Sequence, residues 1–240
     1  MLKLKKIIQS LANDGKIFSN EKQFQIELAW AILHQLPDCE VYLESMIRPG
    51  IKEYTDIVVG LDGKYYPIEL KNRLADRAIV YTIGEDSYYT NKQGATDEGT
   101  LYFVKDIERL ERLKTEVFQG KTFGQGYAII ISNNPLFWKD DEEQSKKGNA
   151  AQSKEETRFQ KGHSLTDEKY IPALYQYLAK EGKKQKVVLS KPYKIEWDDF
   201  YNSHEGWEYL SPNGNIIVVE EHGQKQRTKH PIRFLIVEVD

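Results

Sequence analysis

The stretch YPIELK, residues 66–71, carries an acid and a base two positions apart. Apolar and polar residues alternate along it, which is typical of a strand with one apolar face. Glu69 and Lys71 therefore share the opposite face. A carboxylate beside an ammonium group can bind a cation and contact a reacting phosphate or water, so this segment is the first candidate for chemistry.

The preceding segment adds a second carboxylate at Asp56. The dipeptide Asp62-Gly63 is a strong signal for a two-residue hairpin loop, and this loop pairs Asp56 with Glu69. A four-residue loop gives the same register. Side chains opposed in this way have Cβ atoms ~5 Å apart, and two carboxylates repel there by about 3 kcal/mol at an effective dielectric constant of ~20.

Protonation of one carboxyl, or a cation between the two, relieves this repulsion. Oxygen ligands with room for water suit Mg²⁺. The register therefore predicts a Mg²⁺ site, with Mn²⁺ as a substitute, at Asp56 and Glu69.

The elements around this hairpin predict an α/β domain with a β-rich carboxyl-terminal portion. Residues 72–99 show no clear period and are expected to form a long loop. Helices are expected over residues 4–14, 20–36, 101–118 and 166–182, and strands over residues 39–47, 53–59, 64–71, 126–134, 186–190, 193–197, 206–210, 216–221 and 232–239.

We expect one domain over residues 1–240. Its core spans about residues 20–138. Residues 139–165 are charged and poor in large apolar groups, which predicts a mobile segment. A helix and the β-rich portion follow over about residues 166–240.

Asp56, followed by Glu69 and Lys71 in ELK on consecutive strands after a helix, resembles the PD-(D/E)xK nucleases, the restriction-endonuclease-like superfamily. The resemblance covers about residues 20–138 and departs at Thr55, where a proline is usual. It implies a central mixed sheet between helices and hydrolysis of nucleic-acid phosphodiester bonds.

The resemblance also implies roles for single residues. Asp56 and Glu69 bind the metal with the Leu70 carbonyl, and Lys71 activates the attacking water or stabilises the reacting phosphate. A helix carboxylate lies near the metal, and we assign it to Glu27 in FQIELAW. Gln25, on the same helix, is expected to be exposed.

The expected function is Mg²⁺-dependent cleavage of DNA by an endonuclease. The alternatives are cleavage of RNA, or a catalytically silent member of the fold that binds nucleic acid or a protein partner. Acid-free basic runs cover residues 183–194 and 225–233 and either follow a phosphate backbone or form a solvated surface. The candidate nucleic-acid contacts are Asn72, Arg73, Lys225, Arg227 and Lys229.

Composition excludes several other classes of protein. The single Cys39 excludes a disulfide framework, the five histidines lack metal-ligand spacing, and GKT at residues 120–122 lacks the leading glycine of a phosphate-binding loop. No apolar run approaches the ~18 residues of a membrane span, and the start is too charged for a signal peptide. We therefore expect a cytoplasmic protein, and a homodimer is one option for its oligomeric state.

Overall fold

The computed structural model describes the chain in several stretches. The expected mobile segment at residues 139–165 and the expected helix at 166–182 lie outside the described residues, as do Arg227 and Lys229. The described residues are 2–74, 79–83, 86–90, 96–134, 137, 187–201, 207–210, 216–217, 220–221, 224–225 and 232–240.

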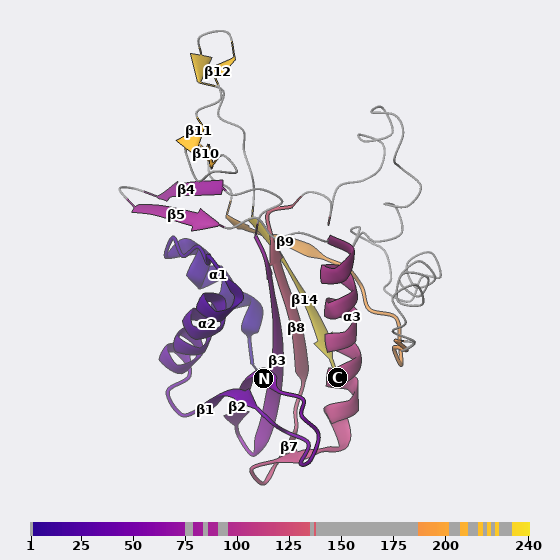
Figure 1. Ribbon diagram of the computed structural model, residues 1–240. Helices are drawn as coiled ribbons and strands as arrows, with labels where there is room; N and C mark the ends of the chain where they lie inside the picture. The colour runs from indigo at the N-terminus through magenta and orange to yellow at the C-terminus, as the bar shows by residue number, and fades with distance from the viewer. Residues whose placement is uncertain are drawn as a thin grey trace.

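A mixed β-sheet forms the centre of the molecule (Figure 1). Its first three strands are an antiparallel meander, the fourth joins parallel to the third, and the last two are antiparallel. The strand order is β1 (Glu40–Ser45), β2 (Thr55–Leu61), β3 (Lys64–Arg73), β8 (Gly126–Ser132), β14 (Ile232–Val239) and β9 (Trp197–Tyr201).

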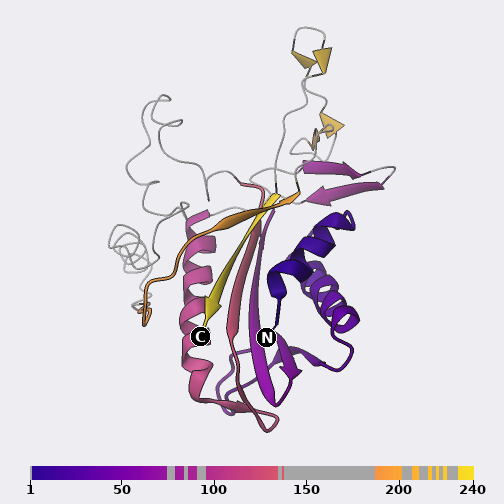
Figure 2. The same cartoon turned by 180° about the vertical axis from the view of Figure 1, so that it is seen from behind.

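Helices cover both faces of this sheet. The helices α1 (Leu4–Asn13) and α2 (Glu21–Gln35) lie on one side and α3 (Thr96–Arg112) lies on the other, in the front view and from behind (Figures 1 and 2). The two faces bury separate hydrophobic cores. The chain is therefore an α/β protein with a mixed sheet flanked by helices.

The β2–β3 hairpin has the expected loop and register. Asp62 and Gly63 have φ angles of 51° and 70°, the left-handed conformation that the two central residues of a type I′ turn require. Ile57 pairs with Ile68, so the next opposed residues along the hairpin are Asp56 and Glu69. The predicted register is confirmed.

The amino-terminal helices are also confirmed. One face of α1 is buried through Leu4, Ile7, Ile8 and Leu11. At the start of α2, the Asn20 side chain accepts a hydrogen bond from the backbone N–H of Gln23 at 2.8 Å, which satisfies one of the free donors of the first turn.

The prediction of a long loop over residues 72–99 is wrong. A hairpin lies there, formed by β4 (Ile79–Ile83) and β5 (Asp86–Thr90). It belongs to a second sheet with β10 (Trp207–Leu210) and β11 (Ile216–Ile217). The pairing of β4 with β10 joins segments that are more than a hundred residues apart along the chain, so no local pattern indicates this part of the sheet.

The third helix begins and ends earlier than expected. It runs from Thr96 to Arg112, and a 3₁₀ turn, η1 (Leu113–Thr115), follows. The short hairpin of β6 (Val117–Phe118) and β7 (Lys121–Phe123) comes next, and β7 pairs with the start of β3. The GKT sequence is therefore part of a hairpin.

The last strand, β14, has the expected bounds, whereas several earlier carboxyl-terminal strands differ from expectation. Residues 187–190 form no strand, and β9 begins only at Trp197. A small two-stranded sheet pairs β12 (Glu220–Glu221) with β13 (Gln224–Lys225). Among the described helices, none combines the length and the hydrophobicity needed to cross a bilayer.

Candidate active site

Asp56, Glu69 and Lys71 lie on the sheet face that α3 covers. Alternation along β2 and β3 turns Ile57 and Ile68 into the core under α1 and α2. Side chains alternate along each strand, so Asp56 lies on the same face as Val58, and Glu69 and Lys71 lie on the same face as Tyr65. Val58 and Tyr65 belong to the core under α3. The structure thus brings the three motif residues together on one side of the hairpin.

Asp56 is held by hydrogen bonds at both its side chain and its backbone. Its Oδ2 accepts a hydrogen bond from the Leu70 N–H at 2.7 Å, and its carbonyl oxygen accepts one from Gln25 Nε2 at 2.5 Å. Burial raises the pKa of Asp56 to about 6, although the Leu70 N–H and the Lys71 ammonium act in the opposite direction. The carboxyl is therefore fixed in place and readily protonated.

Glu69 is fully buried, with a side-chain exposure of 0%. Its Oε2 forms an ion pair with Nη2 of Arg109 from α3, whereas its Oε1 has no hydrogen-bond partner among the described residues. Burial raises the pKa of Glu69 well above its ordinary value, and the Arg109 guanidinium offsets part of that rise.

Lys71 connects the strand to Asp106 on α3. Its Nζ lies 2.9 Å from Asp106 Oδ2 and donates a hydrogen bond to the Leu70 carbonyl at 2.9 Å. Burial acts to lower the pKa of Lys71, but the carboxylates of Asp106 and Glu21 outweigh it and hold the pKa above its ordinary value. Lys71 therefore remains an ammonium group.

Asp106 and Arg109 complete the cluster from the helix side. Arg109 Nη2 lies 3.1 Å from Asp106 Oδ1, three residues earlier on the helix. Burial raises the pKa of Asp106, and Lys71 and Arg109 oppose the rise. Three carboxylates thus face two cations, which leaves one net negative charge when all five groups are ionised.

The sequence analysis missed Asp106 and Arg109. Asp106 lies three residues after Phe103 and four before Leu110, both of which are fully buried. A charged residue within the apolar stripe of a helix was the available signal, because a buried charge needs a partner. The spacing of three residues between Asp106 and Arg109 adds to it.

Gln25 is buried, contrary to expectation. Only 2% of it is exposed, and its Nε2 also donates to Glu44 Oε1 at 2.9 Å. Glu44 has a φ angle of 47°, and the paired residues of β1 and β2 skip it. Gln25 therefore donates a hydrogen bond to the Asp56 carbonyl at the point where the β1–β2 pairing is interrupted.

Glu27, expected to turn toward the metal, lies elsewhere. Its carboxylate oxygens are 3.3 and 3.5 Å from Lys16 Nζ. The helix carboxylate that acts on the cluster is Glu21, in the first turn of α2. It accepts a hydrogen bond from the Asn72 N–H at 3.1 Å and raises the pKa values of Asp56 and Lys71.

Asn72 and Arg73, expected to touch the substrate, differ in placement. The Asn72 side chain is buried and donates to the Phe18 carbonyl at 3.1 Å, on the side of α1 and α2. Arg73 lies against α3 at Gly99, where an added Cβ would approach Arg73 Nε to 2.9 Å. A side chain at position 99 would therefore require the Arg73 side chain to shift.

The basic runs are described only in part. Lys191 and Lys194, in the run over residues 183–194, form ion pairs with Asp240 and Glu196. The backbone of Lys225 belongs to β13, but its side chain lies outside the described residues.

A metal ion would meet an incomplete set of ligands. Among the described residues, no three His, Cys, Asp or Glu side chains form a group that could hold one. The Leu70 carbonyl, expected as a ligand, accepts a hydrogen bond from Lys71. The buried Glu69 Oε1 has no partner in the described part, and an unpartnered carboxylate oxygen is a suitable ligand for a hard cation.

The chain was compared with protein families, curated proteins and solved structures. No family model matches the chain, and neither the curated proteins nor the solved structures contain a match.

Proposed function

We propose that the protein is a Mg²⁺-dependent endonuclease that hydrolyses phosphodiester bonds in DNA. The observation that carries the proposal is the convergence of Asp56, Glu69 and Lys71 on one face of neighbouring strands. All three are held by hydrogen bonds or ion pairs within the cluster rather than projecting into solvent.

The topology supports a restriction-endonuclease-like core. The order of elements is helix α2, strands β1 to β3, the β4–β5 hairpin, helix α3, the β6–β7 hairpin and strand β8. The strand β8 lies parallel to β3 after the α3 crossover. This is the mixed sheet between helices that the resemblance implies.

Asp56 and Glu69 would hold the metal. A bound Mg²⁺ supplies a water molecule of lowered pKa and neutralises charge on the reacting phosphate. With all five groups ionised the cluster has one net negative charge, and a bound divalent cation would offset it and favour an anionic substrate.

The protein's own groups perform the remaining tasks. The Leu70 N–H fixes the orientation of the Asp56 carboxyl. The Lys71 ammonium, paired with Asp106, is a preorganised positive group at the same face. Such a group stabilises negative charge that develops on a phosphate in the transition state.

A cleavage assay on plasmid and single-stranded DNA tests the proposal. The Asp56→Asn, Glu69→Gln and Lys71→Ala variants should each lose at least about 100-fold in rate. Glu27→Gln is the matched control, because Glu27 pairs with Lys16, and it should cleave at the wild-type rate. Wild-type cleavage by Lys71→Ala would contradict the proposed site.

One observation favours a second candidate, a catalytically silent protein that binds nucleic acid. Arg109 already places a cation on Glu69, and this pair can stabilise the fold without a metal. A wild-type protein that binds DNA or RNA tightly but cuts neither with Mg²⁺ or Mn²⁺ would establish this alternative.

A further inference from the structure

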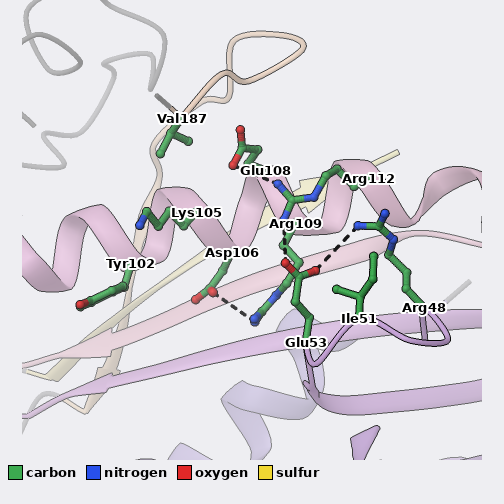
Figure 3. Close-up of a pocket in the computed structure, with 10 residues that line it drawn as sticks. All are labelled: Arg48, Ile51, Glu53, Tyr102, Lys105, Asp106, Glu108, Arg109, Arg112 and Val187. Atoms are coloured by element: carbon green, nitrogen blue, oxygen red, sulfur yellow. Dashed lines mark hydrogen bonds and ion pairs between the residues drawn. The ribbon is translucent and has the colours of Figure 1, made fainter. Parts of the chain in front are cut away.

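A pocket of about 550 Å³ lies beside the carboxylate cluster, between α3 and the segment that joins β1 to β2 (Figure 3). Its lining includes Asp106 and Arg109, which contact Lys71 and Glu69. A ligand bound in this pocket is therefore adjacent to the candidate active site.

Among the described residues of the lining, Arg48 and Arg112 pair with the acids at the end of the pocket near the segment before β2. Glu53 lies between Arg48 and Arg112, with nitrogen–oxygen distances of 3.9 and 3.4 Å (Figure 3). Arg112 also pairs with Glu108 at 3.1 Å. These ion pairs hold the helix against the segment before β2 and leave little free charge there.

The other two basic residues retain free donors. Arg109 uses Nη2 on Glu69 and Asp106, and its Nη1 forms no hydrogen bond among the described residues. Lys105 has no carboxylate partner among the described residues. Anionic oxygens form strong hydrogen bonds with guanidinium and ammonium groups.

An aromatic ring stands beside these donors. Tyr102 is 39% exposed, and Lys105 Nζ lies 5.8 Å from the centroid of its ring. Such a ring can stack on a nucleobase, whatever the base. Among the described residues of the lining, the only other apolar side chains are Ile51 and Val187, and they offer little surface to an apolar ligand.

We propose that this pocket binds one nucleotide of the DNA strand next to the bond that is cut. Arg109 and Lys105 contact its phosphate, and Tyr102 stacks on its base. The identity of the ligand rests on the proposed nuclease function. In this arrangement the substrate strand approaches along the α3 side of the sheet.

Binding of a short fluorescein-labelled single-stranded DNA, measured by anisotropy in Ca²⁺, tests the pocket separately from catalysis. Tyr102→Ala should weaken binding about tenfold, whereas Tyr102→Phe keeps the ring and should bind like the wild type. Lys105→Ala should weaken binding and reduce the salt slope by about one. Lys6→Ala, an exposed lysine on α1 across the sheet, should have no effect.

Wild-type affinity in both Tyr102→Ala and Lys105→Ala would overturn the pocket. The proposed nuclease function would then still be judged by the cleavage assay with Mg²⁺. A wild-type protein that does not bind the probe would overturn the pocket too. Equal weakening in Tyr102→Phe and Tyr102→Ala would overturn the stacking role.

Discussion

At the scale of single residues, Asp56 is one of the buried carboxyls that make stability depend on pH. Its pKa is raised to about 6 by burial, so the folded state holds the proton more tightly than the unfolded chain. This group therefore favours folding most at low pH, and its contribution declines as the pH rises from about 4 to about 6.

We predict that Asp56→Asn stabilises the metal-free protein at neutral pH by up to roughly 3 kcal/mol and has little effect near pH 4. The amide keeps an oxygen to accept the Leu70 N–H and removes the charge. Urea unfolding in EDTA across this range measures the difference. An asparagine variant less stable than the wild type near pH 7 would show that the ionised carboxylate is stabilising.

Arg109 is the second residue with a specific consequence. We predict that Arg109→Ala lowers the stability of the metal-free protein by about 3 kcal/mol, because Glu69 is left buried without a cation. We also predict that Mn²⁺ raises its melting temperature by more than that of the wild type, since the metal no longer competes with the guanidinium for Glu69.

Arg112→Ala is the matched control on the same helix. Its partners Glu53 and Glu108 are both more exposed than Glu69, so the loss should be at most about 1 kcal/mol, with a normal response to Mn²⁺. Equal metal shifts in wild type, Arg109→Ala and Arg112→Ala would show that Arg109 does not compete for the site.

At the scale of elements, α2 supports β2 through one side chain. We predict that Gln25→Ala lowers the free energy of unfolding by about 1–3 kcal/mol, because the Asp56 carbonyl loses its hydrogen-bond donor, the buried Gln25 side chain. Gln35→Ala, on the same helix, removes an exposed hydrogen bond to Ser10 and should cost less. Thermal unfolding of both variants checks this, and equal losses would contradict the special role of Gln25.

At the scale of the whole molecule, the sheet is completed by a distant strand. The strand β14 lies between β8 and β9, and Phe234 and Leu235 are buried in the cores of opposite faces. The expected core over residues 20–138 does not include it. Without β14, the fully buried strand β8 would have an open apolar edge.

We predict that a chain ending at residue 138 does not fold alone, because β8 is buried along its whole length in the complete protein. Such a chain should aggregate or lack a cooperative unfolding transition, in contrast to the full chain. A soluble fragment with a sharp transition in circular dichroism would show that the first strands form an independent core.

The sequence by itself determined the local parts of this site. The Asp62-Gly63 turn and the alternation along the hairpin were enough to place Asp56 opposite Glu69, with Lys71 on the same face. These features depend on residues within a few positions of one another, so their physics is local. The cap at Asn20 could be predicted for the same reason.

Only the tertiary structure decided what surrounds the motif. Gln25 and Glu27 lie two positions apart, so they point to nearly opposite sides of α2, and helix packing determined that Gln25 reaches Asp56. Asp106 and Arg109 reach Glu69 and Lys71 because α3 crosses over that face of the sheet. Contacts between elements far apart in the chain depend on how the whole sheet and its helices pack, and the local pattern of each element contains no such information.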